Sequence, residues 1–246
     1  MKGGPLQSKD ARRGRRFAKR WLEAGLDFVF PPHCAGCDRA GEGWCASCHA
    51  RLRKPAGRGC PACGFPRIHS RRCLACELGE GRLSLRSYAC YGPPLTQAIL
   101  RLKYRPDRKL AGIFAAWLHE ILGPNRSGLE EIIIPIPLAS ARMKQRGYNQ
   151  VELIAAALAS MRGQPHRPRA LRRIRDTGSQ VGLDPGARRR NVAGAFQADE
   201  PSVESKVVLL LDDIVTTGAT LLSASEALLE AGAVRVFCLT VGFAAG

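Results

Sequence analysis

Four Cys-x-x-Cys pairs in one short segment constrain the fold of this chain more than any other feature. The chain has 246 residues and ten cysteines, and eight of these cysteines lie between residues 34 and 76. A Cys-x-x-Cys turn can place two thiolates on one metal ion, and two such turns complete a tetrahedral site. The spacing therefore predicts two structural zinc ions, with the ligands Cys34, Cys37, Cys45, Cys48, Cys60, Cys63, Cys73 and Cys76.

The spacing of the pairs favours two consecutive ribbons. Seven residues separate the first two pairs and nine separate the last two, so a short loop closes each site. An interleaved cross-brace is the alternative, and His33 or His49 could replace a thiolate. A segment this short cannot be stabilised by burial alone, so we expect the metal to supply folding energy rather than redox chemistry. Cys90 and Cys238 lie in apolar runs and are predicted to be core residues.

Net charge and the length of the apolar runs indicate which partners and which cell compartment to expect. The formal net charge is +17, which favours polyanionic partners or phosphate-bearing ligands. The longest apolar runs fall far below the roughly 20 residues needed to span a bilayer. The segment 16–30 carries Glu23 and Asp27, and no small-residue cleavage site follows it. We therefore expect a cytoplasmic protein without a membrane span or a secretory signal.

Beyond residue 80 the chain alternates between strand and helix patterns. Strands are expected at 85–91, 130–137, 206–214 and 234–242. Helices are expected at 93–104, 110–122, 147–161 and 217–233. Such alternation predicts an α/β fold with a parallel sheet. The predicted organisation is a basic N-terminal tail and helix at 1–33, a double zinc ribbon at 34–80 and the α/β domain at 81–246.

The stretch "VVLLLDDIVTTGATL", residues 207–221, carries the main ligand-binding pattern. Ligands bind beyond the carboxyl ends of parallel strands, where Asp212 and Asp213 are expected to lie. The following Thr-rich turn leads into a helix, and a helix N-terminus suits a phosphate. Two carboxylates suit vicinal hydroxyls or a hydrated Mg²⁺. Together these features predict a ribose 5-phosphate site. A helix capped by a threonine is the alternative, but it does not explain two adjacent acids.

Two further basic segments point to anion binding. The stretch "PIPLASARMKQRGYNQ" places Arg142, Lys144 and Arg146 after a strand end, where Arg side chains can match phosphate oxygens. A solvated basic turn is the alternative. The polar interval 171–195 is too long for an ordinary connection, which favours an active-site flap or a basic arm.

The first of these motifs resembles the phosphoribosyl-pyrophosphate loop of the type I phosphoribosyltransferases. The resemblance implies that Asp212 and Asp213 hold the ribose hydroxyls of Mg²⁺-bound phosphoribosyl pyrophosphate. It implies that the 5-phosphate is wrapped by Thr216, Thr217, Gly218, Ala219 and Thr220.

The order of motifs from about residue 28 to the end resembles the ComF competence family. This resemblance implies a double zinc ribbon joined to a type I phosphoribosyltransferase-like domain. The recurrent family positions are Lys103, Tyr104, Arg146, Asn149, Gln150, Thr177, Gln180, Leu183, Arg188 and Asn191. The expected flap residues are Arg175, Thr177, Gln180, Arg188 and Asn191.

The resemblance also implies roles and partners. Asp212, Asp213 and Arg146 are the expected catalytic residues, with Arg142 and Lys144 on the pyrophosphate. The function implied is phosphoribosyl-pyrophosphate binding by a protein that acts in uptake or processing of transforming DNA, with single-stranded DNA and a competence helicase as partners. The alternative is an active phosphoribosyltransferase of nucleotide salvage.

Overall fold

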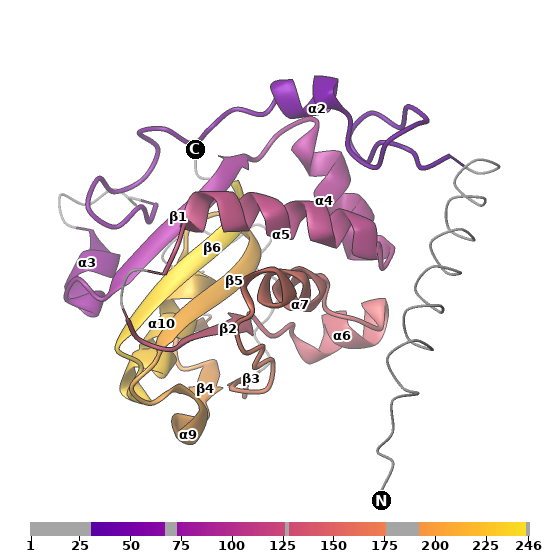
Figure 1. Cartoon of the computed structure of the whole chain (residues 1–246). Coiled ribbons are helices and arrows are strands. Elements are labelled where there is room, and N and C mark those ends of the chain that lie inside the picture. Colours follow the sequence, from indigo (N-terminus) through magenta and orange to yellow (C-terminus); the bar gives the residue numbers. More distant parts are fainter. Residues whose placement is uncertain (1–30, 67–72, 126–127, 176–191, 245–246) are drawn as a thin grey trace, which may run out of the picture.

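A parallel β-sheet forms the centre of the molecule (Figure 1). The computed structural model describes residues 31–66, 73–125, 128–175 and 192–244, and within them the largest sheet has the strand order β1-β6-β5-β2. All neighbouring strands of this sheet run parallel, so their carboxyl ends share one edge. Its strands are β1 (Leu83–Cys90), β2 (Glu131–Pro135), β5 (Val207–Val215) and β6 (Arg235–Phe243).

Helices cover both faces of the sheet, and this explains the near-continuous apolar runs of β2 and β5. On one face lie α4 (Leu95–Tyr104), α5 (Arg108–Leu122) and α7 (Gln150–Arg162), with α10 (Ala219–Glu230) on the other (Figure 1). Side chains alternate along β5. Leu209 and Leu211 belong to the core beneath α4, α5 and α7, whereas Val208 and Leu210 belong to the core beneath α10.

Local sequence signals set where the helices begin. The Asp107 carboxylate accepts a hydrogen bond from the backbone N–H of Leu110 at the start of α5. The Asn149 side chain accepts from the N–H of Val151 at the start of α7. Both are side-chain caps that satisfy helix donors. Among the described residues, no helix is long and apolar enough to cross a membrane.

Short elements complete the described chain. They are α2 (Ala46–Ala50), α3 (Leu74–Gly79), α6 (Ser140–Arg146), α9 (Glu200–Val203) and the antiparallel pair β3 (Leu171–Arg173) and β4 (Phe196–Ala198). The pair β3–β4 forms the base of the interval predicted to be a flap. Residues 176–191, the centre of that interval, lie outside the described residues.

One predicted strand boundary was wrong: β2 ends at Pro135 rather than Pro137, which has no N–H to continue the ladder. β5 ends at Val215, one residue beyond the predicted strand 206–214, and Asp212 and Ile214 pair with β6. The basic stretch after β2, for which a solvated turn was the alternative, forms the short helix α6.

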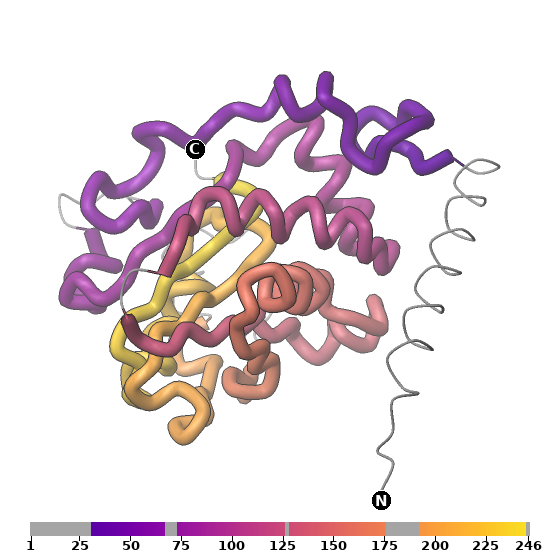
Figure 2. Tube along the Cα trace, in the orientation of Figure 1, coloured from indigo at the N-terminus to yellow at the C-terminus, as the bar shows by residue number. Residues whose placement is uncertain are grey.

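The cysteine-bearing segment 31–66 runs over one edge of the molecule (Figure 2). Its first part contributes Ala35 and Trp44 to the core beneath α4 and α5, and its second part contributes Cys63 and Phe65 to the core beneath α10. The ribbons therefore share the two cores of the α/β body. Cys90 and Cys238 are buried, as predicted.

Candidate functional site

The eight paired cysteines gather into two sets of four. The sets are Cys34, Cys37, Cys45, Cys48 and Cys60, Cys63, Cys73, Cys76, and within each set all sulfur atoms lie within 4.8 Å of one another. This is the consecutive arrangement that the spacing favours, and among the described residues neither His33 nor His49 joins a set. The His33 ring is hydrogen-bonded to the Asp38 carbonyl, and His49 lies beside the Tyr88 hydroxyl.

The sulfur geometry fits zinc. Sulfur–sulfur distances are 3.8 Å for Cys37–Cys45 and 3.7 Å for Cys60–Cys76, and a Zn–S bond of about 2.3 Å gives a tetrahedral edge of about 3.8 Å. Burial opposes ionisation of Cys34, but backbone N–H groups of Cys45, Gly36 and Cys37 outweigh it and lower the pKa of the Cys34 thiol to about 6. Zinc binds thiolates, so the surroundings of Cys34 favour its metal-binding form, whereas burial raises the pKa of Cys48 in the same set.

A second candidate site is a cavity of about 500 Å³ at the carboxyl edge of the sheet. Asp212 and Asp213 of β5 line one side, and the residues after β2, including Arg142 of α6, line another. Thr216 and Thr220 bring the turn before α10 to the same cavity. Ligands of open α/β sheets bind at this edge, where the connections diverge.

The two carboxylates have different partners. Asp213 is buried; its Oδ2 atom lies 3.0 Å from Lys103 Nζ and accepts a 2.7 Å hydrogen bond from Gln150 Nε2. The half-buried Asp212 accepts from the backbone N–H of Asp213 at 2.8 Å. Burial and the neighbouring Asp213 charge raise the pKa of Asp212 to about 7, against the opposing effects of the Asp213 N–H, Lys103 and Arg142. Asp213 is thus fixed by protein partners, whereas Asp212 is the carboxylate with more capacity to accept a ligand hydroxyl.

The turn between β5 and α10 is built on a glycine. Gly218 adopts φ 78° and is the N-cap of α10, and no side chain caps this helix. The alternative of a simple threonine cap is therefore wrong for this turn. Thr217 Oγ1 instead accepts from the N–H of Ala219 at 3.4 Å, within the turn itself. Glycine adopts the left-handed conformation seen at Gly218 without a steric penalty, and this conformation allows a tight loop at the helix N-terminus.

The basic residues of α6 divide into two groups. Arg142 lines the cavity, whereas Lys144 is exposed and is not among the residues that line it. Arg146 Nη1 donates to Gln150 Oε1 at 3.0 Å, so it reaches Asp213 through Gln150. Arg146 therefore supports the carboxylate pair rather than lining the cavity.

The predicted flap is described only at its base. Arg175 donates to the carbonyl of Ala193 across that base, and the neighbouring Arg173 of β3 lines the cavity. The flap positions Thr177, Gln180, Arg188 and Asn191 lie outside the described residues.

Sequence patterns assign a role to only some residues of the cavity. Arg173 lies in the interval 171–195 that is predicted to be an active-site flap or basic arm, whereas Tyr91 is predicted only as a strand residue. Lys103 and Gln150 were noted only through the resemblance, without a role. A polar residue at the first position of an apolar helix, such as Gln150, is the kind of signal that could have suggested burial against the strand end.

Comparisons with known proteins match both parts of the chain. Residues 25–77 match the double zinc ribbon domain family and residues 162–244 match the phosphoribosyl transferase domain family. The DNA utilization protein YhgH of Salmonella typhimurium is 34% identical over 207 residues, which cover 80% of this chain and 89% of the relative.

A second relative and a solved structure complete the comparison. The competence protein ComFC of Bacillus subtilis is 30% identical over 195 residues, or 76% of this chain and 78% of the relative. A structure of the allosteric regulatory enzyme of purine biosynthesis aligns with 57% of this chain and 29% of that chain, at 20% identity and a TM-score of 0.38.

Proposed function

This chain belongs to the ComF family of proteins with a double zinc ribbon and a phosphoribosyltransferase-like domain, and on that premise we propose that its cavity binds Mg²⁺–phosphoribosyl pyrophosphate. The observation that carries the proposal is the convergence of two acids, two threonines and Arg142 on one cavity of about 500 Å³. A sugar phosphate presents the complementary groups: hydroxyls for carboxylates and phosphate oxygens for hydroxyls, backbone N–H groups and guanidinium.

We assign each group by its chemistry. Asp212, with Asp213 behind it, accepts hydrogen bonds from the ribose hydroxyls, and the loop from Thr216 to Thr220 surrounds the 5-phosphate. Arg142 and, at longer range, Lys144 neutralise the pyrophosphate. Mg²⁺ would enter with the ligand, and Asp212 and Asp213 would be its nearby hard oxygen donors. The ion offsets negative charge on the pyrophosphate.

The decisive experiment is calorimetric titration of Mg²⁺–phosphoribosyl pyrophosphate into the zinc-loaded protein. We expect micromolar binding that is lost in the double variant Asp212→Asn, Asp213→Asn. Glu230→Gln removes one exposed acid elsewhere and is the charge control. Equal binding by the double variant and the control would contradict the assignment.

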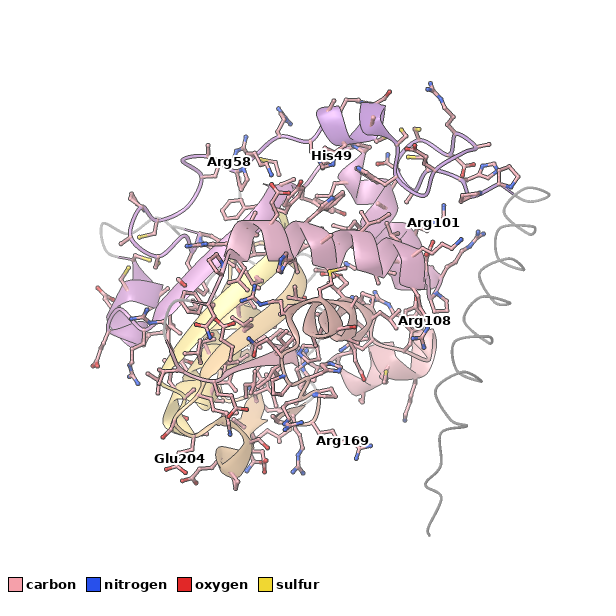
Figure 3. The ribbon with its side chains drawn as sticks, in the orientation of Figure 1. His49, Arg58, Arg101, Arg108, Arg169 and Glu204 are labelled. Carbon is pink, nitrogen blue, oxygen red and sulfur yellow. The ribbon has the colours of Figure 1, made fainter. Side chains whose placement is uncertain are left out.

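We propose further that the protein acts in the cytoplasm in the uptake or processing of transforming DNA, together with a competence helicase. The side chain of Tyr104 is 68% exposed, and the Arg146 guanidinium lies 5.9 Å from its ring. Arg142 and Lys144 are exposed on α6, and Figure 3 shows Arg108 at the α4–α5 end of the molecule. An exposed aromatic ring among cations suits a stacked base on a single-stranded phosphate backbone.

Salt-dependent binding to single-stranded DNA tests this second role. Affinity should fall steeply between about 50 and 200 mM salt if several phosphates are contacted. Tyr104→Ala should weaken binding at all salt concentrations, and Tyr104→Phe should not, because stacking needs the ring rather than the hydroxyl. Binding that ignores both salt and the ring would contradict the proposed surface.

An active phosphoribosyltransferase is the alternative that the same cavity favours. Arg142 lies on the same cavity as Asp212, where it could stabilise a departing pyrophosphate. Release of pyrophosphate upon addition of nucleobases or DNA would establish the transferase activity. Binding without release of pyrophosphate for every acceptor would contradict this alternative and leave ligand binding as the only function of the cavity.

A further inference from the structure

The second zinc ribbon lies directly against the turn proposed to hold the phosphate. A Cβ atom placed on Gly218 would lie 3.2 Å from Phe65 Cδ1 and 3.4 Å from Pro66 Cδ. Phe65 is 1% exposed and belongs to the same core as Val215 and Leu221, the residues that flank this turn. The ring of Phe65 therefore forms part of the wall behind the glycine of the turn.

The position of Phe65 is fixed by the ribbon itself. Its carbonyl accepts a 2.8 Å hydrogen bond from the N–H of Cys60, and its own N–H points to the sulfur of Cys63. The Cys63 carbonyl accepts from the N–H of Leu85 on β1 at 2.7 Å. Phe65 thus sits between the metal-binding turn and the sheet, with backbone bonds to two of the four ligand residues.

The other half of the second ribbon supports α10, the helix that follows the turn. Cys73 is the N-cap residue of α3, and Cys76 lies within α3. This short helix packs against α10 and β1, and Cys73 and Cys76 pack against the core that contains Phe65. The start of α10 therefore contacts Phe65, and its side contacts α3. Both of these contacting elements are attached to ligand residues of the second sulfur set.

The contacts of the first ribbon with the body, as far as its described residues show them, lie on α4 and α5. Its Trp44 ring packs on Trp117 of α5 with a centroid distance of 5.1 Å, and the carbonyl of His33 accepts from Arg101 of α4. These contacts lie on the face of the sheet opposite α10 (Figure 1). The first ribbon is therefore an internal control with the same metal chemistry.

We propose that the second ribbon, through Phe65, positions the phosphate-binding turn, so that affinity for a sugar phosphate depends on zinc in the second site but not in the first. The ligand part of this inference rests on the function proposed above. Because a coupling free energy acts in both directions, ligand bound at the turn must also stabilise zinc in the second site.

Two ligand substitutions form a matched test. Cys45 and Cys73 are both half-buried and are the N-cap residues of the short helices α2 and α3. Cys73→Ser should weaken binding of Mg²⁺–phosphoribosyl pyrophosphate about tenfold or more, and Cys45→Ser should change it less than about twofold. Equal losses in both variants would overturn the proposal.

Phe65→Leu separates positioning from metal loss. Leucine keeps this core position apolar but removes the ring behind Gly218, so this variant should retain both zinc ions by elemental analysis while weakening ligand binding several-fold. Unchanged affinity in a variant with two zinc ions would overturn the role of Phe65 whether or not Cys73→Ser folds.

The reciprocal effect provides a readout other than binding. Zinc release to the chelator 4-(2-pyridylazo)resorcinol should show one phase for each site. Saturating Mg²⁺–phosphoribosyl pyrophosphate should slow one phase only, and Cys73→Ser should lack that phase. Slowing of both phases, or of neither in a protein that binds the ligand, would contradict the coupling.

Hydrogen exchange without any ligand keeps the two proposals distinguishable. Amides of residues 216–222 should exchange faster in Phe65→Leu and Cys73→Ser than in the wild type, and Cys45→Ser should leave them unchanged. If the wild type binds no phosphoribosyl pyrophosphate but this exchange pattern appears, the proposed function fails and the positioning role stands. If the wild type binds phosphoribosyl pyrophosphate but this exchange pattern does not appear, the positioning role fails and the proposed function stands.

Discussion

The two zinc ribbons carry the same four-cysteine pattern but are attached to the body in different ways. The first is held by side chains, above all by the stacked rings of Tyr88 and Trp117 with Trp44 at their edge. The second is held by backbone contacts as well as by buried side chains, with Gly64 so close to β1 that a Cβ would lie 2.1 Å from the Leu85 carbonyl oxygen. Both ribbons have the same set of four ligands, so the different residues around those ligands decide which part of the body each ribbon contacts.

Removal of a zinc ligand should separate the ribbons most strongly. Cys63 is buried in the core beneath α10, whereas Cys37 is exposed. We expect Cys63→Ser to destabilise the whole protein by several kcal/mol, since it removes the metal and leaves a polar group in a core. Cys37→Ser should lose one zinc with a smaller change in the main unfolding transition. Thermal unfolding by circular dichroism, with zinc content measured in parallel, checks both, and equal shifts in Tm would remove the distinction.

A pair of glycines tests the backbone contact alone. Gly64 and Gly57 both have positive φ, at 80° and 70°, but no atom lies within 4 Å of a Cβ placed on Gly57. Gly57→Ala should cost about 1–2 kcal/mol of backbone strain. Gly64→Ala adds a collision with the Leu85 backbone and should cost about 3 kcal/mol or more in denaturant unfolding. Similar costs would mean that the close approach to β1 contributes nothing.

The pH dependence of ligand binding should not depend on the ribbons. Because the pKa of Asp212 is raised to about 7, the carboxylate becomes ionised as pH rises through 7. If the ionised form binds ribose, affinity should increase about tenfold between pH 6 and pH 8. The pH dependence of binding that remains in Asp212→Asn is the control, because it shows the effect of the ligand's own ionisable groups. Phe65→Leu should bind the ligand more weakly but show the same dependence of affinity on pH as the wild type. A weaker dependence on pH in this variant would show that the second ribbon affects the ionisation of the carboxylates.

The same pKa makes an opposite prediction for stability. The folded-state pKa of Asp212 lies above its ordinary value of 3.8, so the folded protein binds a proton that the unfolded chain releases. This contribution is present below about pH 4 and is lost as pH rises through 7. Asp212→Asn should therefore raise the Tm of the ligand-free protein relative to wild type more at pH 8 than at pH 5. A constant difference across this range would contradict the assignment.

The smallest effect concerns the side-chain attachment of the first ribbon. Trp44 packs edge-on against Trp117, and aromatic pairs of this kind contribute about 0.5–1.5 kcal/mol beyond area burial. Trp44→Leu should lower stability by about that amount without changing affinity for Mg²⁺–phosphoribosyl pyrophosphate. Trp44→Phe, which keeps a ring, is the control and should lie closer to wild type. A loss of ligand affinity in Trp44→Leu would show that the first ribbon is coupled to the cavity as well.

Features with short sequence spacing could be predicted from the sequence alone. Each sulfur set joins two Cys-x-x-Cys turns separated by seven or nine residues, so spacing was enough to favour the consecutive pairing. The pattern of Asp212, Asp213 and the Thr-rich turn is continuous in sequence, and the alternation of strands and helices indicated a parallel sheet. Element boundaries were less accurate, because β2 ends two residues before the predicted Pro137, which has no N–H for the strand ladder.

Only the tertiary structure decided which distant residues meet. Gln150 and Asp213 are 63 positions apart, and Phe65 and Gly218 are farther apart still. No local pattern encodes such contacts, because they depend on the strand order, on the face that each helix covers and on the strand edge that the second ribbon occupies. The sequence by itself therefore determined the chemistry of the metal sites and of the acidic strand. The fold decided that Lys103 and Gln150 hold Asp213, and that Phe65 of the second ribbon lies behind the turn of the cavity.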